Sequence, residues 1–220
     1  MRELIVHTAP KSVISENIKI LRTSLQFSSV DKPIKTLMIT SSMQGEGKSF
    51  ISSNLAVSFA ALGKRVLIID CDMRRGSVHK KFGISNLEGL SNFLVDEVSG
   101  YTRYIQNTSI ENVYVMTSGI VPPNPSELLS SNRFAKFIDV ISEQYDLVVF
   151  DTPPVTVVSD ACIIASKIDK TVIVAMANKV PVNDVQKTKK KLEEANANIA
   201  GVVFNGTEIS QKQYYNKYYN

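Results

Sequence analysis

Short apolar runs alternate with helical segments along most of this chain. Six continuous apolar runs have the character of parallel strands that are covered on both faces, at residues 37–39, 65–70, 113–117, 147–151, 171–175 and 200–204. Helices are predicted between them, at 14–27, 90–95, 102–106, 132–144, 160–166 and 182–196, with a further apolar helix after residue 49 that Gly63 ends. Strands that alternate with helices predict an α/β fold, with a mainly parallel central sheet, right-handed crossovers and flanking helices.

The two ends of the chain lack this pattern. Residues 1–13 predict a poorly specified arm, and the helix at 14–27 follows with Ser15 as its N-cap. Residues 211–220 hold four of the eight tyrosines, among Asn, Gln and Lys, with no period that would pack them into a core. We therefore expect a single domain over residues 1–210 and a mobile, tyrosine-rich tail at 211–220.

A phosphate-binding loop is predicted where the first apolar run meets the helix after it. The connecting turn ends in the letters G-E-G-K-S at residues 45–49. Its glycines let successive backbone N–H groups face an anion, and the following helix directs its positive end to the same place. Lys48 can reach the outer phosphates of a nucleotide and the Ser49 hydroxyl can bind Mg²⁺. The usual pattern has a glycine where this chain has Ser42.

Acidic residues follow two of the predicted strands. Asp70 and Asp72 come at the end of the second apolar run, and Asp151 ends the fourth. Ligands of open α/β sheets bind at the carboxyl ends of the strands, so these carboxylates are expected beside the phosphate loop. Phosphoryl transfer depends mainly on placement and on neutralising oxygen charge. Ser49 and an acid can hold Mg²⁺ with water completing the octahedron, and Asp151 is the expected Walker B acid.

Composition limits the class of protein further. No apolar run approaches the roughly 20 residues that cross a bilayer, and Arg2 and Glu3 precede only a short apolar stretch, so neither a membrane span nor a secretory signal is predicted. Cys71 and Cys162 have no metal-ligand spacing. They are interpreted as small buried residues of a protein in a reducing, cytosolic compartment.

The net charge of +4 is mildly basic and would suit either an anionic membrane surface or nucleic acid. Of these two, we expect no nucleic-acid partner. The second of two basic groups is interpreted as the solvated face of a helix. The two groups are Arg74, Arg75, Lys80 and Lys81, and then Lys187, Lys189, Lys190 and Lys191.

Several motifs occur together and in order. They are the phosphate loop at 42–49, L-I-I-D-C-D-M-R at 67–74, V-P-P-N-P-S-E-L-L at 121–129, L-V-V-F-D-T-P-P at 147–154, G-V-V-F-N at 201–205, and the tyrosine-rich end. In these motifs the chain resembles the bacterial protein-tyrosine kinase (BY-kinase) family of capsule and exopolysaccharide systems, from about residue 12 to the C-terminus. The resemblance implies a P-loop NTPase-like fold of the MinD/ParA group with its deviant Walker motif.

The resemblance also implies roles for individual residues. The family uses ATP and Mg²⁺, and by carry-over Asp72 would accept the tyrosine proton while Asp70 and Asp151 organise Mg²⁺ and its waters. Arg74 would steady the transferred phosphate, and Lys48 would complete the catalytic set. The expected nucleotide contacts are Met43, Gln44, Gly45, Glu46, Gly47, Lys48, Ser49, Phe50 and Asn205.

The tail supplies the acceptors that the resemblance implies. Kinases of this family phosphorylate chiefly the tail of a neighbouring copy, which here carries Tyr214, Tyr215, Tyr218 and Tyr219. Each phosphate would add roughly −1.5 to −2 charges, so a fully phosphorylated cluster would repel itself and drive an assembly apart. The family cycles between these two states to control polysaccharide length and export.

A helical motif implies the assembly itself. The family's E-x-x-R-x-x-R motif, tied to ring-shaped oligomers, corresponds here to Glu16, Lys19 and Arg22, with Lys in place of the middle Arg. Lysine lacks the planar bidentate fork of arginine. We therefore predict a homo-oligomeric ring, such as an octamer, that is weaker than is usual for the family.

Partners and location follow from the same resemblance. Gram-positive members have no membrane span of their own and are activated by the short cytoplasmic tail of a separate membrane adaptor. We therefore expect a cytoplasmic protein, peripheral at the inner face of the cell membrane, with a tyrosine phosphatase as a further partner.

Two other functions share some of these features. A MinD/ParA-like ATPase switch has the same sheet and a deviant loop, but it carries an additional lysine where this chain has Met43. A nucleotide-gated scaffold would use the tyrosine-rich tail only to bind a partner. Transfer of phosphate to the tail separates the kinase from both.

Overall fold

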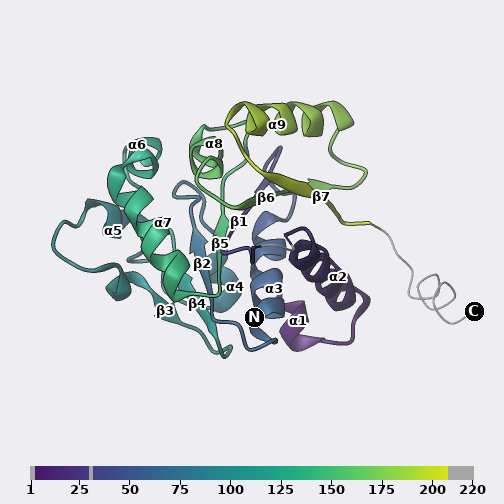
Figure 1. Ribbon diagram of the computed structural model, residues 1–220, viewed down its shortest axis with the longest axis horizontal. Coiled ribbons are helices and arrows are strands. Elements are labelled where there is room, and N and C mark those ends of the chain that lie inside the picture. Colours follow the sequence, from purple (N-terminus) through teal and green to yellow (C-terminus); the bar gives the residue numbers. More distant parts are fainter. Residues whose placement is uncertain (1–2, 30–31, 208–220) are drawn as a thin grey trace, which may run out of the picture.

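The computed structural model describes residues 3–29 and 32–207, which form one central sheet with helices on both faces (Figure 1). In chain order its strands are β1 (Thr36–Ser41), β2 (Val66–Asp70), β3 (Gln106–Asn107), β4 (Val113–Met116), β5 (Leu147–Asp151), β6 (Lys170–Met176) and β7 (Ile199–Asn205). Within these described residues they make a seven-stranded sheet in the order β3-β4-β2-β5-β1-β6-β7. Every neighbouring pair is parallel except β3–β4. The predicted, mainly parallel α/β sheet is confirmed.

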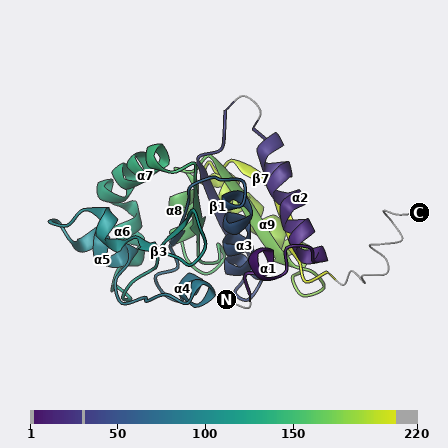
Figure 2. The same ribbon diagram turned by 90° about the horizontal axis from the view of Figure 1, so that it is seen from below.

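The helices connect these strands and cover both faces of the sheet. In chain order they are α1 (Ile5–Thr8), α2 (Val13–Phe27), α3 (Lys48–Ala60), α4 (Val78–Phe82), α5 (Leu90–Val95), the 3-10 helix η1 (Tyr101–Tyr104), α6 (Pro125–Ser130), α7 (Asn132–Gln144), α8 (Asp160–Ala165) and α9 (Val182–Glu194). Figures 1 and 2 show α5, α6 and α7 grouped near the β3–β4 edge, with α2 lying beside α3. None of the helices in the described ranges is both long enough and apolar enough to cross a membrane.

Alternate residues of the central strands pack into two separate cores. On one face Met38 of β1 and Val148 of β5 join side chains from α5, α7, α8 and α9. On the other face Leu37, Ile39 and Val149 join side chains from α1, α2, α3 and α4. Because both faces are covered, the strands consist of unbroken apolar runs rather than alternating ones.

Helix α3 is enclosed between the sheet and the helices outside it. All but two of its residues, Ser49 and Phe50, are buried. It packs against β1, β2 and β5 on one side and against α1 and α2 on the other. A helix that is apolar all round is stable only when it is buried in this way. The N-terminus of α3, where the phosphate loop ends, is therefore held rigidly.

The N-terminal arm is ordered where it is described. Leu4 and Val6 are buried, and the Val6 N–H donates to Asn54 Oδ1 on α3 at 3.1 Å. The prediction of a poorly specified arm was therefore wrong for residues 3–13. One helical turn is too short to produce a recognisable period, so the apolar contacts of this segment were not apparent.

Helix α2 begins at Val13, and its N-cap is Ser12 rather than the predicted Ser15. The Ser12 Oγ accepts a hydrogen bond from the Ser15 N–H at 3.2 Å. Ser15 is fully buried, and its hydroxyl donates to the carbonyl oxygens of Ile5 and Ala9. The serine that was predicted to cap α2 instead ties α2 to α1.

The region between β2 and α7 differs most from the prediction. The helix expected at 102–106 is the 3-10 helix η1, followed directly by β3, and α4 was not predicted. Within the motif at 121–129, residues 121–124 form a loop, and α6, which was not predicted, begins at Pro125. Proline suits this position because the first helical residue needs no hydrogen bond from its nitrogen.

Surface and cysteine predictions have mixed outcomes. The four lysines of α9 are exposed, which confirms a solvated helix face. Cys71 is buried as expected, but Cys162 is only half-buried, and both thiols are free. The tail at 211–220, with its four tyrosines, lies outside the described residues.

Candidate nucleotide-binding and catalytic site

The loop between β1 and α3 adopts a conformation that requires glycine at two positions. Gly45 has φ of 81° and Gly47 has φ of 92°, both in the left-handed region. A Cβ on Gly47 would also lie 2.0 Å from Asn205 Nδ2. Asn205 ends β7, and its side-chain amide donates to the carbonyl oxygen of Glu46 at 3.0 Å. The loop is therefore fastened to β7 through a contact that only glycine permits.

Ser42, which stands where the usual pattern has glycine, is fully buried and hydrogen-bonded. Its Oγ lies 2.9 Å from Thr188 Oγ1 on α9, and its carbonyl oxygen accepts from Thr156 Oγ1 at 2.5 Å. The serine that replaces glycine therefore has hydrogen-bond partners for its hydroxyl and its carbonyl oxygen within the fold. Ser42 anchors the start of the loop to α9 and to the segment after β5.

The loop opens onto a basic cavity of about 520 Å³. Lys48, the first residue of α3, lines the cavity with only 8% of its surface exposed. Three further cationic side chains join it, from the segment after β2 and from α4. The cavity residues are Gln44, Gly45, Gly47, Lys48, Ser49, Phe50, Asp72, Arg75, Gly76, Ser77, Lys80 and Lys81. Positive side chains and a helix N-terminus around one cavity favour an anion such as a polyphosphate.

The carboxylates predicted to converge do lie together beside this loop. Asp70 of β2 and Asp151 of β5 occupy opposite positions on neighbouring parallel strands. The Ser49 hydroxyl donates to Asp151 Oδ2 at 2.5 Å, and the Ser77 hydroxyl lies 2.8 Å from Ser49 Oγ. Asp151 Oδ1 is buried and has no hydrogen-bond partner within residues 3–29 and 32–207. An unpaired buried carboxylate oxygen is costly, which indicates that it is kept for a ligand.

Burial raises the pKa values of both strand-end acids. The pKa of Asp151 rises from 3.8 to about 6 because the carboxyl is desolvated, although the Ser49 hydroxyl and Lys48 oppose that rise. The pKa of Asp70 is raised well above its usual value by burial and then by the charge of Asp151. Two buried, neighbouring acids that resist joint ionisation are expected where a cation belongs.

Asp72 and Asp70 organise the turn after β2 through backbone hydrogen bonds. Asp70 accepts from the backbone N–H of Asp72 at 3.2 Å and of Val78 at 3.0 Å. Asp72 Oδ1 accepts from the N–H groups of Arg74 and Arg75 at 3.3 and 2.9 Å. Asp72 is half-exposed and lines the cavity, whereas Asp70 is fully buried beneath it. Of these two acids, Asp72 is the one that an incoming substrate can reach.

The donor set fits Mg²⁺ held partly by a nucleotide. Ser49 Oγ, Asp151 and Asp70 present hydroxyl and carboxylate oxygens next to the cavity. Residues 3–29 and 32–207 contain no group of three or more His, Cys, Asp or Glu side chains placed to bind a metal alone. Mg²⁺ commonly takes one or two carboxylates together with substrate phosphates and water, rather than an all-protein cage. The residues present therefore fit Mg²⁺ that arrives with a phosphate ligand.

Three of the predicted site residues point elsewhere. Met43 is half exposed, and its N–H donates to the carboxylate of Glu46, which is almost fully buried. Neither side chain lines the basic cavity. Arg74 lies outside it as well, because its guanidinium Nε is 3.6 Å from Asp160 Oδ2. Met43 and Glu46 thus shape the loop from behind, whereas Arg74 lies in the turn that borders the cavity and its side chain pairs with Asp160.

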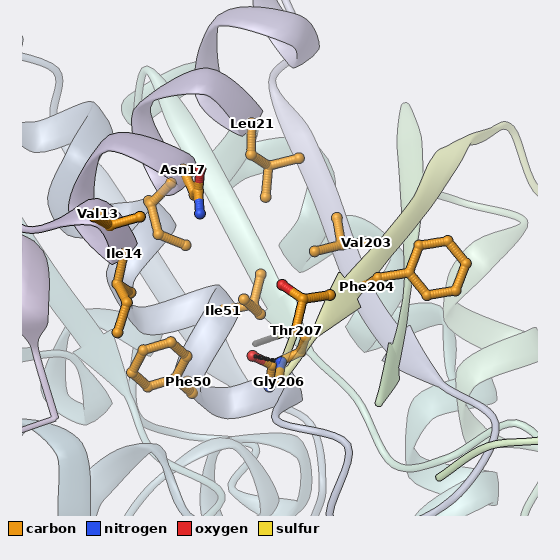
Figure 3. Close-up of a pocket in the computed structure, with 12 residues that line it drawn as sticks. Val13, Ile14, Asn17, Leu21, Phe50, Ile51, Val203, Phe204, Gly206 and Thr207 are labelled. Atoms are coloured by element: carbon orange, nitrogen blue, oxygen red, sulfur yellow. Dashed lines mark hydrogen bonds between the residues drawn. The ribbon is translucent and has the colours of Figure 1, made fainter. Parts of the chain in front are cut away.

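A second cavity of about 400 Å³ adjoins the first (Figure 3). Phe50 lines both cavities, and Asn205 lines the second one while bonding to the phosphate loop. In Figure 3 the side chains of Ile14, Leu21 and Val203 face this space from α2 and β7, whereas Phe204 points away from it. An apolar cavity next to a phosphate site has the character of a nucleobase site.

Glu16, Lys19 and Arg22 do not act as one surface motif in the isolated chain. Glu16 and Lys19 form an ion pair of 2.7 Å, and Lys19 also donates to the Pro10 carbonyl oxygen at 3.0 Å. The guanidinium of Arg22 turns towards α3 and donates to the Ser58 carbonyl oxygen at 2.8 Å. Glu16 and Lys19 are therefore available at the surface of α2, while Arg22 connects α2 to the phosphate-loop helix.

Sequence reasoning missed several residues of the site. Ser77 contacts Ser49, and Gly76 lies so close to Asp70 that a Cβ there would be 2.8 Å from Asp70 Oδ2. Asp160 is fully buried beside Arg74. The basic cluster around residues 74–81 was noted as charge but not assigned to the cavity. A serine and a glycine in a loop and an aspartate that begins a helix of six residues carry no periodic signal, so only the folded arrangement identifies them.

Comparisons with known proteins identify first the class and then the family of this chain. The family profile ParA, described as NUBPL iron-transfer P-loop NTPase, matches residues 33–219. The chain is therefore a P-loop NTPase of this class. Tyrosine-protein kinase YwqD of Bacillus subtilis is 39% identical over 217 residues, which are 99% of this chain and 91% of that protein. The similarity to this tyrosine-protein kinase thus extends over nearly the full length of both chains.

Solved structures agree with the sequence relatives. The chimerical protein CapA2B2 has a TM-score of 0.90 at 40% identity, covering 95% of this chain and 92% of that chain. The kinase domain of Escherichia coli tyrosine kinase ETK has a TM-score of 0.90 at 36% identity, covering 94% of this chain and 81% of that chain. The chain belongs to the bacterial protein-tyrosine kinase (BY-kinase) family, and its enzyme class is that of a protein-tyrosine kinase.

Proposed function

We propose that this protein is an ATP- and Mg²⁺-dependent autokinase that phosphorylates the C-terminal tyrosines of neighbouring subunits. The observation that carries the proposal is the contact of Ser49 with Asp151, beside Asp70, at the end of the phosphate loop. A hydroxyl and two carboxylates next to a basic cavity are the groups that phosphoryl transfer needs for metal and phosphate placement. The acceptors would be Tyr214, Tyr215, Tyr218 and Tyr219.

The nucleotide would lie across the two adjoining cavities. Its phosphates would occupy the basic cavity, where Lys48 and the N–H groups of the loop neutralise them. Its adenine would enter the apolar cavity of Figure 3, beside Phe50 and Asn205. Mg²⁺, when bound, supplies charge that neutralises the phosphate oxygens, and Ser49, Asp151 and Asp70 are the residues that would hold it.

The transfer step would use the exposed acid of the pair after β2. The tyrosine oxygen attacks the γ-phosphorus, the bond from that phosphorus to the β–γ bridging oxygen breaks, and ADP leaves. Asp72 takes the phenolic proton, because it lines the cavity while Asp70 is buried. A free phenol has a pKa near 10, so a carboxylate placed at the attacking oxygen assists the loss of its proton. Arg74 would steady the transferred phosphate.

Assembly and partners form the second level of the proposal. Glu16, Lys19 and Arg22 of α2 would contribute to a ring such as an octamer, and a membrane adaptor would activate the kinase through its cytoplasmic tail. The chain would act at the inner face of the membrane in capsular or exopolysaccharide synthesis and export, with a phosphatase resetting the tail. The similarity to the chimerical protein CapA2B2 and to named tyrosine kinases supports this placement.

One incubation tests the catalytic proposal. The full chain is mixed with Mg-ATP and a synthetic peptide of the adaptor's cytoplasmic tail, and phosphate is then located by mass spectrometry. We expect label on the C-terminal tyrosines that is lost in Lys48→Met. Free phosphate without tyrosine label would instead favour a MinD/ParA-like ATPase switch, and neither product would favour a nucleotide-gated scaffold.

The ring is tested separately by measuring mass in solution. Glu16→Ala removes the partner of Lys19 and is expected to shift the assembly towards smaller species. Glu193→Ala is a matched control, since it breaks an exposed ion pair of 3.4 Å with Lys189 on α9. An assembly that is unchanged by Glu16→Ala would remove α2 from the interface.

A further inference from the structure

Asp160 is a buried acid that the catalytic scheme above does not use. It is the first residue of α8, and its side chain has no exposed surface. Its Oδ1 accepts a hydrogen bond from the Ser126 hydroxyl of α6 at 2.5 Å. Its Oδ2 has no hydrogen-bond partner in the part of the chain that the structure describes, and it faces the guanidinium of Arg74, with Nε at 3.6 Å. A buried carboxylate with one oxygen left for a single cation needs a reason.

We propose that Asp160, fixed by Ser126, is a positioning residue that holds the Arg74 side chain at the edge of the catalytic site. The inference rests on the proposed function, in which Arg74 steadies the transferred phosphate.

The contact joins three segments that are far apart in the sequence. Arg74 lies in the turn after β2, Ser126 in α6 and Asp160 at the start of α8. The backbone N–H of Arg74 donates to Asp72 Oδ1, so the main chain of Arg74 is already fixed next to the acid that faces the cavity. Only the long arginine side chain remains to be directed. Asp160 directs it. Without a fixed partner, the arginine side chain would lose conformational entropy whenever it became ordered against a phosphate.

The burial of the two partners differs in a way that suits this role. Asp160 is fully buried, while the side chain of Arg74 is 42% exposed. Exposed ion pairs between mobile chains contribute little, but a charge that is fixed and shielded from water gives a directional anchor. Because Arg74 is open to solvent on one side, its guanidinium can still contact a phosphoryl group while Asp160 holds it from behind.

The proposal also gives a role to the proline-rich segment. The motif at 121–129 had no assigned task, and it leads into α6, which starts at Pro125 and places Ser126 against Asp160. Leu129 of the same helix is fully buried in the core and fixes α6 in place. The segment thus supports the arginine through a chain of two contacts, Ser126 to Asp160 and Asp160 to Arg74.

A double-mutant cycle tests the proposal with the full chain, Mg-ATP and the adaptor-tail peptide. Arg74→Ala is expected to lower kcat roughly 100-fold, as the loss of one charge-stabilising group commonly does. Asp160→Asn keeps the shape and the bond to Ser126, and should lower kcat about 10-fold by letting the arginine move. The KM for ATP should stay unchanged, because neither residue lines the phosphate cavity.

The cycle itself distinguishes positioning from a general structural effect. In the Arg74→Ala background, Asp160→Asn should change kcat by less than about twofold, because the group that it positions is gone. Equal effects in both backgrounds, or no effect of Asp160→Asn on wild type, would overturn the proposal. If Arg74→Ala leaves kcat unchanged, the role given to Arg74 under the proposed function fails as well.

Two further variants test the contact with Ser126 and supply a matched control. Ser126→Ala removes one hydrogen bond and leaves the Asp160 charge, so it should lower kcat in the same direction by about twofold, with KM again unchanged. Asp146→Asn removes the partner of Lys64 at 3.9 Å, at the other end of the sheet, and should leave kcat unaltered. A drop with Asp146→Asn as large as that with Asp160→Asn would count against a specific role for Asp160.

Discussion

The carboxylates at the two ends of the central sheet differ in their burial and in their hydrogen bonds. At the end where the strands begin, Asp169 Oδ2 accepts from the backbone N–H groups of Lys35 and Thr36, each at 3.0 Å. Asp146 Oδ2 likewise accepts from the Arg65 N–H at 2.8 Å. At the end where the strands finish, Asp70 and Asp151 are deeply buried side by side. Asp70 accepts two backbone N–H groups, whereas Asp151 Oδ1 has no hydrogen-bond partner among the described residues.

This difference separates acids whose oxygens hold the fold together from Asp151, which keeps one oxygen for a ligand. A carboxylate that accepts backbone N–H groups satisfies donors that would otherwise be unpaired, so it stabilises the native state. A buried carboxylate with an unpaired oxygen and a raised pKa destabilises the folded state at pH values where it is ionised. Such groups persist where function needs them, at a cost in stability.

Asp151→Asn is expected to have the largest effect, and it should lower activity while it raises stability. Phosphorylation of the tail should fall at least about 100-fold, because an amide cannot neutralise a cation at this position. The nucleotide-free protein should become more stable at neutral pH, by on the order of 1 kcal/mol, since the pKa of Asp151 is raised to about 6 and its ionisation is unfavourable when it is buried. Initial rates and chemical denaturation measure the two quantities.

Lower stability of the Asp151→Asn variant at neutral pH would contradict this division. The hydrogen bond from Ser49 would then be worth more than the unfavourable charge. Asp151 would in that case stabilise the fold as the acids at the opposite end of the sheet do, and the distinction between the two ends would be wrong.

The pH dependence of stability tests the same charges in the wild-type protein. The folded state raises the pKa of Asp151 from 3.8 to about 6, so its contribution is fully present below 3.8 and is lost as pH rises through about 6. The free energy of unfolding of the wild type, relative to that of Asp151→Asn, should therefore fall across this interval. Thermal denaturation at a series of pH values measures it.

Saturating Mg-ADP should remove that fall, because the ligand favours the ionised carboxylates and binds only the folded chain. Burial raises the pKa of Asp70 as well, so its ionisation as pH rises should add a decline of the same sign. A wild-type curve that runs parallel to that of Asp151→Asn, with and without Mg-ADP, would exclude Asp151 as the titrating group.

Much of the catalytic end could be predicted from the sequence because its signals are local. A run of apolar residues that ends in an acid marks Asp70 and Asp151, and the glycines before Lys48 mark the loop. The parallel arrangement then brings the strand ends to one edge of the sheet. The prediction that Asp70 and Asp151 lie beside Ser49 needed only these features.

Contacts that depend on short elements could not be predicted in the same way. Helices α1, α4 and α6 have four to six residues each, which is too few for a helical period to show. Asp160 becomes buried only because α6 and α8 meet around it. The turn of Arg22 towards Ser58 likewise depends on how α2 packs on α3. Each of these contacts joins segments whose distance in the sequence carries no signal.

Asp169→Ala should show the behaviour of the end where the strands begin. The variant leaves the N–H groups of Lys35 and Thr36 without their acceptor, so the free energy of unfolding should fall by about 1–3 kcal/mol. The affinity for Mg-ADP, measured by calorimetry, should be unchanged, because the nucleotide cavities lie at the other end of the strands. Weaker nucleotide binding at equal folding would show that the two ends are coupled through the sheet.

Ser42→Ala is expected to have the smallest effect. It tests whether location in the phosphate loop or an unpaired polar atom identifies a residue that serves the nucleotide. Ser42 lies at the ligand end of the sheet, but its hydroxyl is buried and bonded to Thr188 Oγ1 at 2.9 Å. Since the group is satisfied, its loss should lower the free energy of unfolding by about 1 kcal/mol and change the affinity for Mg-ADP by less than about twofold. Thr188→Val, which removes the partner from α9, should give the same result. A larger loss of affinity in either variant would mean that location in the loop, rather than an unpaired polar atom, determines which residues serve the nucleotide.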